Sequence, residues 1–137
     1  MRRWIGMLLC VCLMIFGAAG CSTEKDGNTD GRSEVEFTVV NPDKIPEELA
    51  QEIENNKQGE IRMSYTDGGK MYLVRGYGEQ KTGGYSISVV ECTENENEIY
   101  LDTRLLGPAN QDQISKEPSY PCLVLMIEAR EKEVKIQ

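Results

Sequence analysis

The sequence predicts a small α+β fold that is mainly β: about six mostly antiparallel strands, as a curved sheet or a small barrel, with one packed helix. Three observations lead to this prediction. Apolar segments rich in β-branched residues recur between turns rich in Gly, Pro, Asn and Asp. Residues 67–69, Asp-Gly-Gly, separate two of these segments and are typical of a tight hairpin. Only one segment has the apolar spacing of a helix.

The predicted helix begins at Pro46, because proline is tolerated in the first turn. Two glutamates follow it and face the positive end of the helix dipole. Ile45, Leu49 and Ile53 then form a narrow apolar stripe, through which the helix is expected to pack on the sheet. Gly59 is suited to end this segment.

The strands are justified by alternation and by the turns around them. Tyr85, Ile87 and Val89 would face one way, and Val90 and Cys92 would then fall on the other face unless a bulge resets the register. The apolar run 123–127 is typical of a strand that is covered on both faces. The strands are expected at 35–40, 61–66, 71–75, 85–92, 99–105 and 122–129, with a glycine-rich loop at 76–84, a long polar loop at 107–119 and a charged tail from Arg130.

Residues 1–20 are predicted to be a bacterial lipoprotein signal peptide. Two arginines precede an apolar run, 5–16, that is too short to span a membrane, and small residues lead to Cys21. Signal peptidase II would cut before Cys21, whose thiol would carry a diacylglycerol, with two acyl chains to hold the membrane. Ala18 stands where such peptides prefer leucine. An ordinary secretory signal cut near Ala19 and an uncleaved anchor are the alternatives.

The remaining chain is expected to divide into a flexible polar tether, 21–33, and a single β-rich domain, 34–137. The predicted location is the extracytoplasmic face of the cell membrane, with the lipid as the anchor because the chain has no polybasic patch. A net charge of −8 repels phosphate backbones and excludes nucleic acid as a partner.

The composition argues against enzymatic chemistry. The chain has no histidine, so Ser-His and Cys-His mechanisms are excluded. We predict no catalytic residue, no metal site and no cofactor other than the diacylglycerol on Cys21. Cys92 and Cys122 would remain after removal of the signal peptide. They would form a disulfide outside the cell, or act as two small apolar residues, and the sequence leaves both open.

One family resemblance emerges from residues 78–87, Gly-Glu-Gln-Lys-Thr-Gly-Gly-Tyr-Ser-Ile. Two alternating strands, a proline-containing loop and Tyr-Pro before the last apolar strand follow them. This order, over 72–129, resembles the PrcB C-terminal domain family of bacterial lipoproteins. The family usually places a basic residue and proline before Thr-Gly-Gly-Tyr, where this chain has Gln80 and Lys81. The resemblance implies a non-catalytic accessory subunit that helps a secreted serine protease complex to mature or to remain stable.

The residues of the glycine-rich element are the candidate partner-binding site. They are Gln80, Lys81, Thr82, Gly83, Gly84 and Tyr85. In a purely structural interpretation the glycines supply unusual backbone angles and the tyrosine packs in the core. The expected partner is an exported protease or another secreted protein, bound in a chaperone-like manner. The alternatives are a protease inhibitor that inserts residues 80–84, which are similar to a loop of chagasin-type inhibitors, and a surface lipoprotein that binds a wall or small-molecule ligand.

Overall fold

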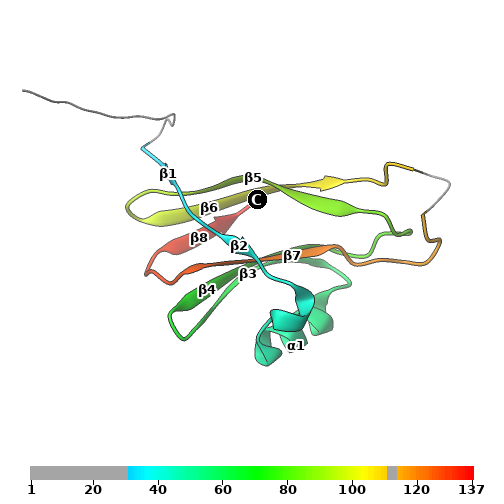
Figure 1. Cartoon of the computed structure of the whole chain (residues 1–137), viewed down its shortest axis with the longest axis horizontal. Coiled ribbons are helices and arrows are strands. Elements are labelled where there is room, and N and C mark those ends of the chain that lie inside the picture. Colours follow the sequence, from blue (N-terminus) through cyan, green and yellow to red (C-terminus); the bar gives the residue numbers. More distant parts are fainter. Residues whose placement is uncertain (1–30, 111–113) are drawn as a thin grey trace, which may run out of the picture. The chain divides into compact units, whose positions relative to one another are not determined.

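The computed structural model describes residues 31–110 and 114–137 (Figure 1). Cys21 and the predicted signal peptide lie outside the described residues, as does the tether up to residue 30. No helix in the described part of the chain has the length and apolar character that crossing a membrane requires. The elements are β1 (Ser33–Glu34), β2 (Thr38–Val39), the 3-10 turn η1 (Pro42–Lys44), α1 (Glu47–Asn56), β3 (Glu60–Asp67), β4 (Lys70–Tyr77), β5 (Ser86–Glu94), β6 (Glu98–Leu106), β7 (Cys122–Glu128) and β8 (Glu133–Ile136).

These strands form two four-stranded sheets, in the orders β1-β5-β6-β8 and β2-β7-β4-β3. The sheets pack face to face, since one core cluster joins Ile99 and Leu101 of the first sheet to Leu73 and Leu125 of the second. The predicted mainly β fold with one packed helix is confirmed. The choice between a barrel and an open arrangement is also settled, because the two sheets do not close into a barrel.

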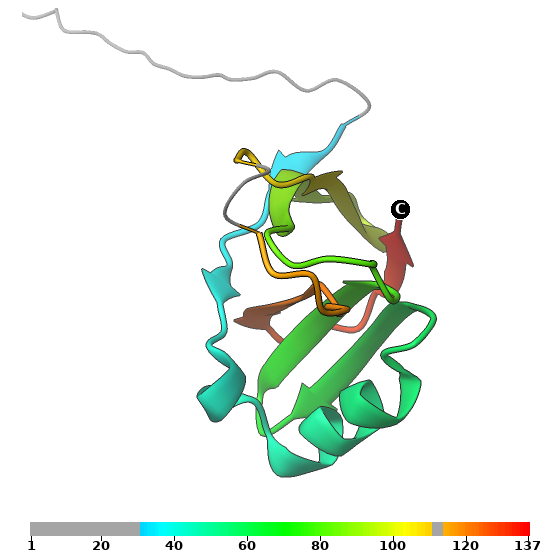
Figure 2. The same cartoon turned by 90° about the vertical axis from the view of Figure 1, so that its right-hand side faces the viewer.

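The helix covers the outer face of the second sheet (Figure 2). Leu49 is fully buried against Ile61, Val74 and Val124, and Ile45 and Ile53 pack against the same cluster. The predicted apolar stripe is therefore the contact surface of α1. Because Val124 faces the helix and Leu125 the other sheet, β7 is covered on both faces, as its continuous apolar sequence predicts.

The strand register confirms the predicted hairpin and decides between the two possibilities that the sequence left open in β5. Gly68 and Gly69 connect β3 to β4 with φ of 57° and 85°, the left-handed angles that a two-residue hairpin turn needs. In β5 the pairing with β6 shifts between Val89 and Glu91. A bulge at Val90 therefore resets the register, so that Cys92 joins the same core cluster as Val89, while Val90 is 47% exposed.

The prediction of one strand at 35–40 is wrong. Of this segment only Thr38–Val39 form a strand, β2, which pairs with β7 in one sheet, while β1 ends at Glu34 and pairs with β5 in the other sheet. A single chain that passes from sheet to sheet cannot pair with both along its whole length, so Glu36 and Phe37 belong to neither ladder. We call residues 33–40 the strap. Ser33 already pairs with Glu94, so pairing begins one residue before the predicted domain boundary.

A further strand, β8, lies in the tail that the sequence presented as merely charged. It runs parallel to β6, with Val134 opposite Ile99 and Ile136 opposite Leu101. Val134 and Ile136 pack against the core between the sheets. The sequence signal for this strand was the alternation of charged and apolar residues over 133–136, only four residues long.

Arg75 is the buried charged residue of the described chain, and it holds the end of β8. Its Nε donates to the backbone oxygen of Gln137 at 2.7 Å, and its Nη1 donates to the carbonyl of Gly76 at 2.6 Å. The guanidinium also lies 3.9 Å from the centre of the Tyr77 ring. A buried guanidinium is costly unless its donors form hydrogen bonds. Here these bonds join β4 to the residue that follows β8.

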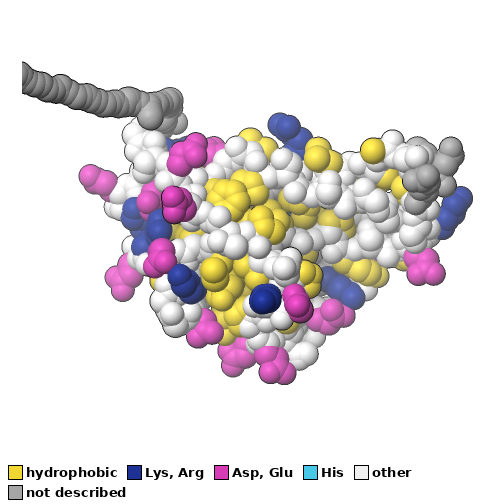
Figure 3. Space-filling view, viewed as in Figure 1, with side chains coloured by type: hydrophobic (Ala, Val, Ile, Leu, Met, Phe, Trp, Pro, Cys, Tyr) yellow, Lys and Arg dark blue, Asp and Glu magenta, His cyan; other side chains and the backbone are white. Residues whose placement is uncertain are grey.

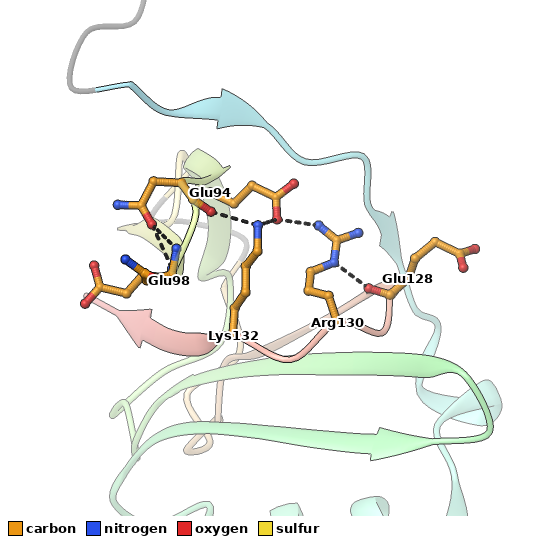
Figure 4. Close-up of polar contacts among 7 residues, drawn as sticks. Glu94, Glu98, Glu128, Arg130 and Lys132 are labelled. Atoms are coloured by element: carbon orange, nitrogen blue, oxygen red, sulfur yellow. Dashed lines mark hydrogen bonds and ion pairs between the residues drawn. The ribbon is translucent and has the colours of Figure 1, made fainter.

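A polar cluster around Glu94 fixes the connection between β7 and β8 (Figure 4). One carboxylate oxygen of Glu94 accepts hydrogen bonds from Arg130 at 2.8 Å and from Lys132 at 2.9 Å. Burial raises the pKa of Glu94, but the hydrogen bonds from Lys132 and Arg130 outweigh it and leave the pKa below its usual value. The cluster ties this connection to the end of β5.

The two cysteines of the domain are free thiols. Cys92 packs in the core between the sheets, whereas Cys122 packs on the helix side of β7. A disulfide between them would have to pass through a sheet, so the structure corresponds to the alternative of two apolar cysteines. Burial raises the pKa of each thiol to about 11.

We therefore expect both thiols to resist alkylation in the native protein. The thiolate is the reactive species, and at pH 8 a pKa near 11 leaves only about one thiol in a thousand ionised. Treatment of native and urea-unfolded protein with N-ethylmaleimide, followed by peptide mass spectrometry, should show modification of Cys92 and Cys122 only after unfolding. Rapid labelling of either residue in the native protein, or a bridged peptide containing both, would contradict this expectation.

Candidate functional site

The predicted partner-binding residues lie in the loop 78–85 between β4 and β5. This loop rests against the described part of the loop 107–121 between β6 and β7, and we call the two together the loop pair. Figure 2 looks at the molecule from the end that carries the loop pair and shows both loops in front of the sheets. Two segments far apart in the sequence thus form one surface.

Main-chain hydrogen bonds hold the two loops together. Gln80 N–H donates to the carbonyl of Ser119 at 2.8 Å, and Ser119 N–H donates back to Gln80 at 3.0 Å. Gly83 N–H donates to the carbonyl of Ser115 at 3.0 Å. The Ser119 hydroxyl donates to the carbonyl of Thr82 at 2.7 Å. These bonds join the glycine-rich element to the second loop at Gln80, Thr82 and Gly83, which fixes the position of its main chain at these residues.

Gly84 is required both for its backbone angle and for space. Its φ is 90°, and a Cβ there would lie 2.8 Å from Cβ of Pro108 and 3.0 Å from Cγ2 of Ile114. Gly83 is less constrained, because its φ is not positive and a Cβ would meet Ser115 at 3.3 Å. The interpretation that the glycines supply unusual backbone angles thus applies to Gly84. The missing side chain of Gly84 lets the two loops approach each other closely.

Neither Tyr85 nor Lys81 is buried in the core. Tyr85 is half-buried and packs against neither core cluster; its ring lies beside Gly107, where a Cβ would be 3.9 Å from Cε1. Lys81 is exposed at the tip of the loop. Gln80 donates from Nε2 to the carbonyl of Tyr77 at 3.2 Å.

The arrangement suits recognition of another surface. A fixed main chain presents exposed side chains, among them Glu79, Lys81, Lys116 and Glu117, at one end of a rigid β scaffold. Within residues 31–110 and 114–137, no three His, Cys, Asp or Glu side chains lie together as metal ligands would.

The strap forms a second surface that sequence reasoning missed. Phe37 is 40% exposed and Val39 55% exposed. Beside them is a hollow of about 450 Å³, and Figure 3 shows hydrophobic side chains gathered in the middle of this face. Regular alternation would have turned Val35, Phe37 and Val39 to the core together, but only Val35 is buried. We call this hollow the Phe37 groove; it is lined by Glu34, Val35, Glu36, Phe37, Thr38, Lys70, Met126, Ile127 and Glu128.

Comparison with known proteins gives one match. Residues 71–128 match the family model described as PrcB C-terminal, which confirms the resemblance carried by the Thr-Gly-Gly-Tyr element. The matched segment runs from β4 to β7 and contains the loop pair, while the strap, α1 and β8 lie outside it. No curated protein and no solved structure matches the chain significantly.

Proposed function

We propose, from the membership of residues 71–128 in the PrcB C-terminal family, that the chain is a non-catalytic accessory subunit of a protease complex. In this proposal the protein is held on the extracytoplasmic face of the cell membrane by a diacylglycerol on Cys21. It binds an exported protease or another secreted protein there and stabilises it.

The observation that carries the proposal is that the family match contains the whole loop pair. The Thr-Gly-Gly-Tyr element and the segment 114–119 are joined by main-chain hydrogen bonds, and the close approach at Gly84 depends on both. A surface built in this way keeps its shape before a partner arrives, which lowers the entropic cost of binding. The same bonds weigh against insertion of residues 80–84 into a protease cleft, because they hold Gln80, Thr82 and Gly83 against the neighbouring loop.

Site-specific crosslinking in cells that naturally make the protein tests this function. Benzoylphenylalanine in place of Lys81 should crosslink, on irradiation, to an exported protease or another secreted protein. The same residue in place of Glu52, which is exposed on the outer side of α1, is the matched control and should not. If neither position captures an exported protein, or both capture the same one equally, the loop pair is not the binding surface.

Replacement of Cys21 by alanine should abolish membrane retention and leave the chain poorly processed. Each buried methylene of an acyl chain contributes about 0.8 kcal/mol to membrane binding, so the loss of two chains removes the anchor. Immunoblots of washed membranes and of the soluble fraction measure the outcome. Cys12→Ala, which changes another cysteine of the signal peptide, should retain the protein as wild type does. Equal retention of the Cys21→Ala protein would refute lipidation at this residue.

A further inference from the structure

We propose that the Phe37 groove docks an extended segment of a partner polypeptide, in which an apolar side chain is flanked by lysine or arginine. The proposal rests on the proposed binding function and adds a second contact surface to it. The strap side of the groove lies outside the family match, whereas Met126, Ile127 and Glu128 on its other side lie within it.

The floor of the groove is apolar. Val35 and Ile127 are buried beneath it, Met126 is half-buried, and Phe37 projects beside them. Phe37 and Val39 are two of the four large hydrophobic residues that are exposed in the described chain, and they lie two residues apart on the strap. An exposed aromatic ring beside a hollow is the kind of anchor that dominates the energetics of protein interfaces.

The rim of the groove is acidic. Glu128 forms a salt bridge with Lys70 at 2.8 Å, which neutralises the one basic side chain of the lining. Glu34 and Glu36 are exposed, and no cation of the described residues forms a salt bridge with either. Two uncompensated carboxylates beside an apolar floor complement a segment with basic residues around an apolar one.

The charges also argue against other occupants. An anionic membrane surface would repel this rim. A second copy would bring the same two carboxylates to an isologous interface, where they would face one another. The neighbouring main chain favours an extended ligand, because Glu36 and Phe37 belong to neither strand ladder and leave the strap open between β1 and β2.

A randomised peptide library on phage, panned against the full chain in detergent, tests the proposal. Enriched peptides should carry an aromatic or aliphatic residue flanked by lysine or arginine, and their affinity should fall as salt is raised. Phe37→Ala should weaken their binding about tenfold, as expected for an interface anchor. The double variant Glu34→Gln, Glu36→Gln should weaken it about tenfold as well.

The matched control removes the same charge elsewhere. Glu47→Gln with Glu52→Gln, both exposed on α1, should change the affinity less than about twofold, since screening weakens distant charges. Enrichment of acidic peptides, or of peptides that bind both groove variants like wild type, would overturn the proposal. The proposal would also be overturned if the protein formed a dimer, or bound phosphatidylglycerol vesicles, and Phe37→Ala abolished that association. Panning uses purified protein only, so a negative result there does not affect the crosslinking test at Lys81. A negative crosslinking result likewise does not affect the panning test of the Phe37 groove.

Discussion

Replacement of Arg75 by methionine should lower the free energy of unfolding by about 3 kcal/mol, because a buried and a partly buried main-chain oxygen lose a charged donor. The Gln137 and Gly76 oxygens would each lose a hydrogen bond, and the stacking on Tyr77 would disappear. Urea unfolding followed by circular dichroism measures the change. Because Arg75 holds the end of β8, amide hydrogen exchange should also show faster exchange in Glu133–Ile136 than in wild type.

Arg62 provides the matched control for this experiment. It lies opposite Arg75 in the register of β3 and β4, and both contact the same oxygen of Glu60. The Arg62 side chain, however, is 45% exposed, whereas that of Arg75 is 6% exposed. Arg62→Met should therefore cost less than about 1 kcal/mol, as exposed ion pairs usually do. Equal losses for the two variants would mean that the buried bonds contribute nothing beyond surface charge.

Replacement of Gly84 by alanine should destabilise the protein by about 2–4 kcal/mol. A positive φ strains a residue that carries a Cβ, and overpacking against Pro108 and Ile114 adds to the strain. The loops would have to separate, so crosslinking from position 81 should also fall. Thermal unfolding and the crosslinking yield measure the two effects.

Gly107→Ala is the control within the same loop pair. Gly107 has no positive φ, and its Cβ would lie at an ordinary contact distance from Tyr85. We expect a change of less than about 1 kcal/mol in the free energy of unfolding. A Gly84→Ala protein as stable as the Gly107→Ala protein would show that the close approach of the loops is not needed.

The features that the sequence predicted correctly are those decided by local chemistry. The stripe through Leu49 and the turn at Gly68 and Gly69 each follow from spacing or from backbone angles within a few residues. Their partners lie nearby in the chain or in the next strand. Local rules therefore sufficed for the helix and the hairpin, whereas they left the register of β5 after Val89 open.

The features that the sequence missed depend on residues far away in the chain. Whether the strap is one strand or two is decided by where β5 and β7 lie, and β8 exists because β6 offers an edge. In the site, the need for glycine at position 84 was predictable, but its neighbours Pro108 and Ile114 were not. The exposure of Phe37 was hidden for the same reason, since alternation alone would bury it.

The strap also determines how the domain responds to mechanical tension. A pull along the chain from residue 31 reaches β1 first, and β1 has two residues paired with β5 at the edge of a sheet. The β3–β4 ladder behind it joins eight residue pairs. Antiparallel pairs loaded at one end separate bond by bond, so the strap would peel away before the β3–β4 ladder opens. Force and ligand would then compete for the same residues, with Phe37 withdrawn from its hollow before the fold yields.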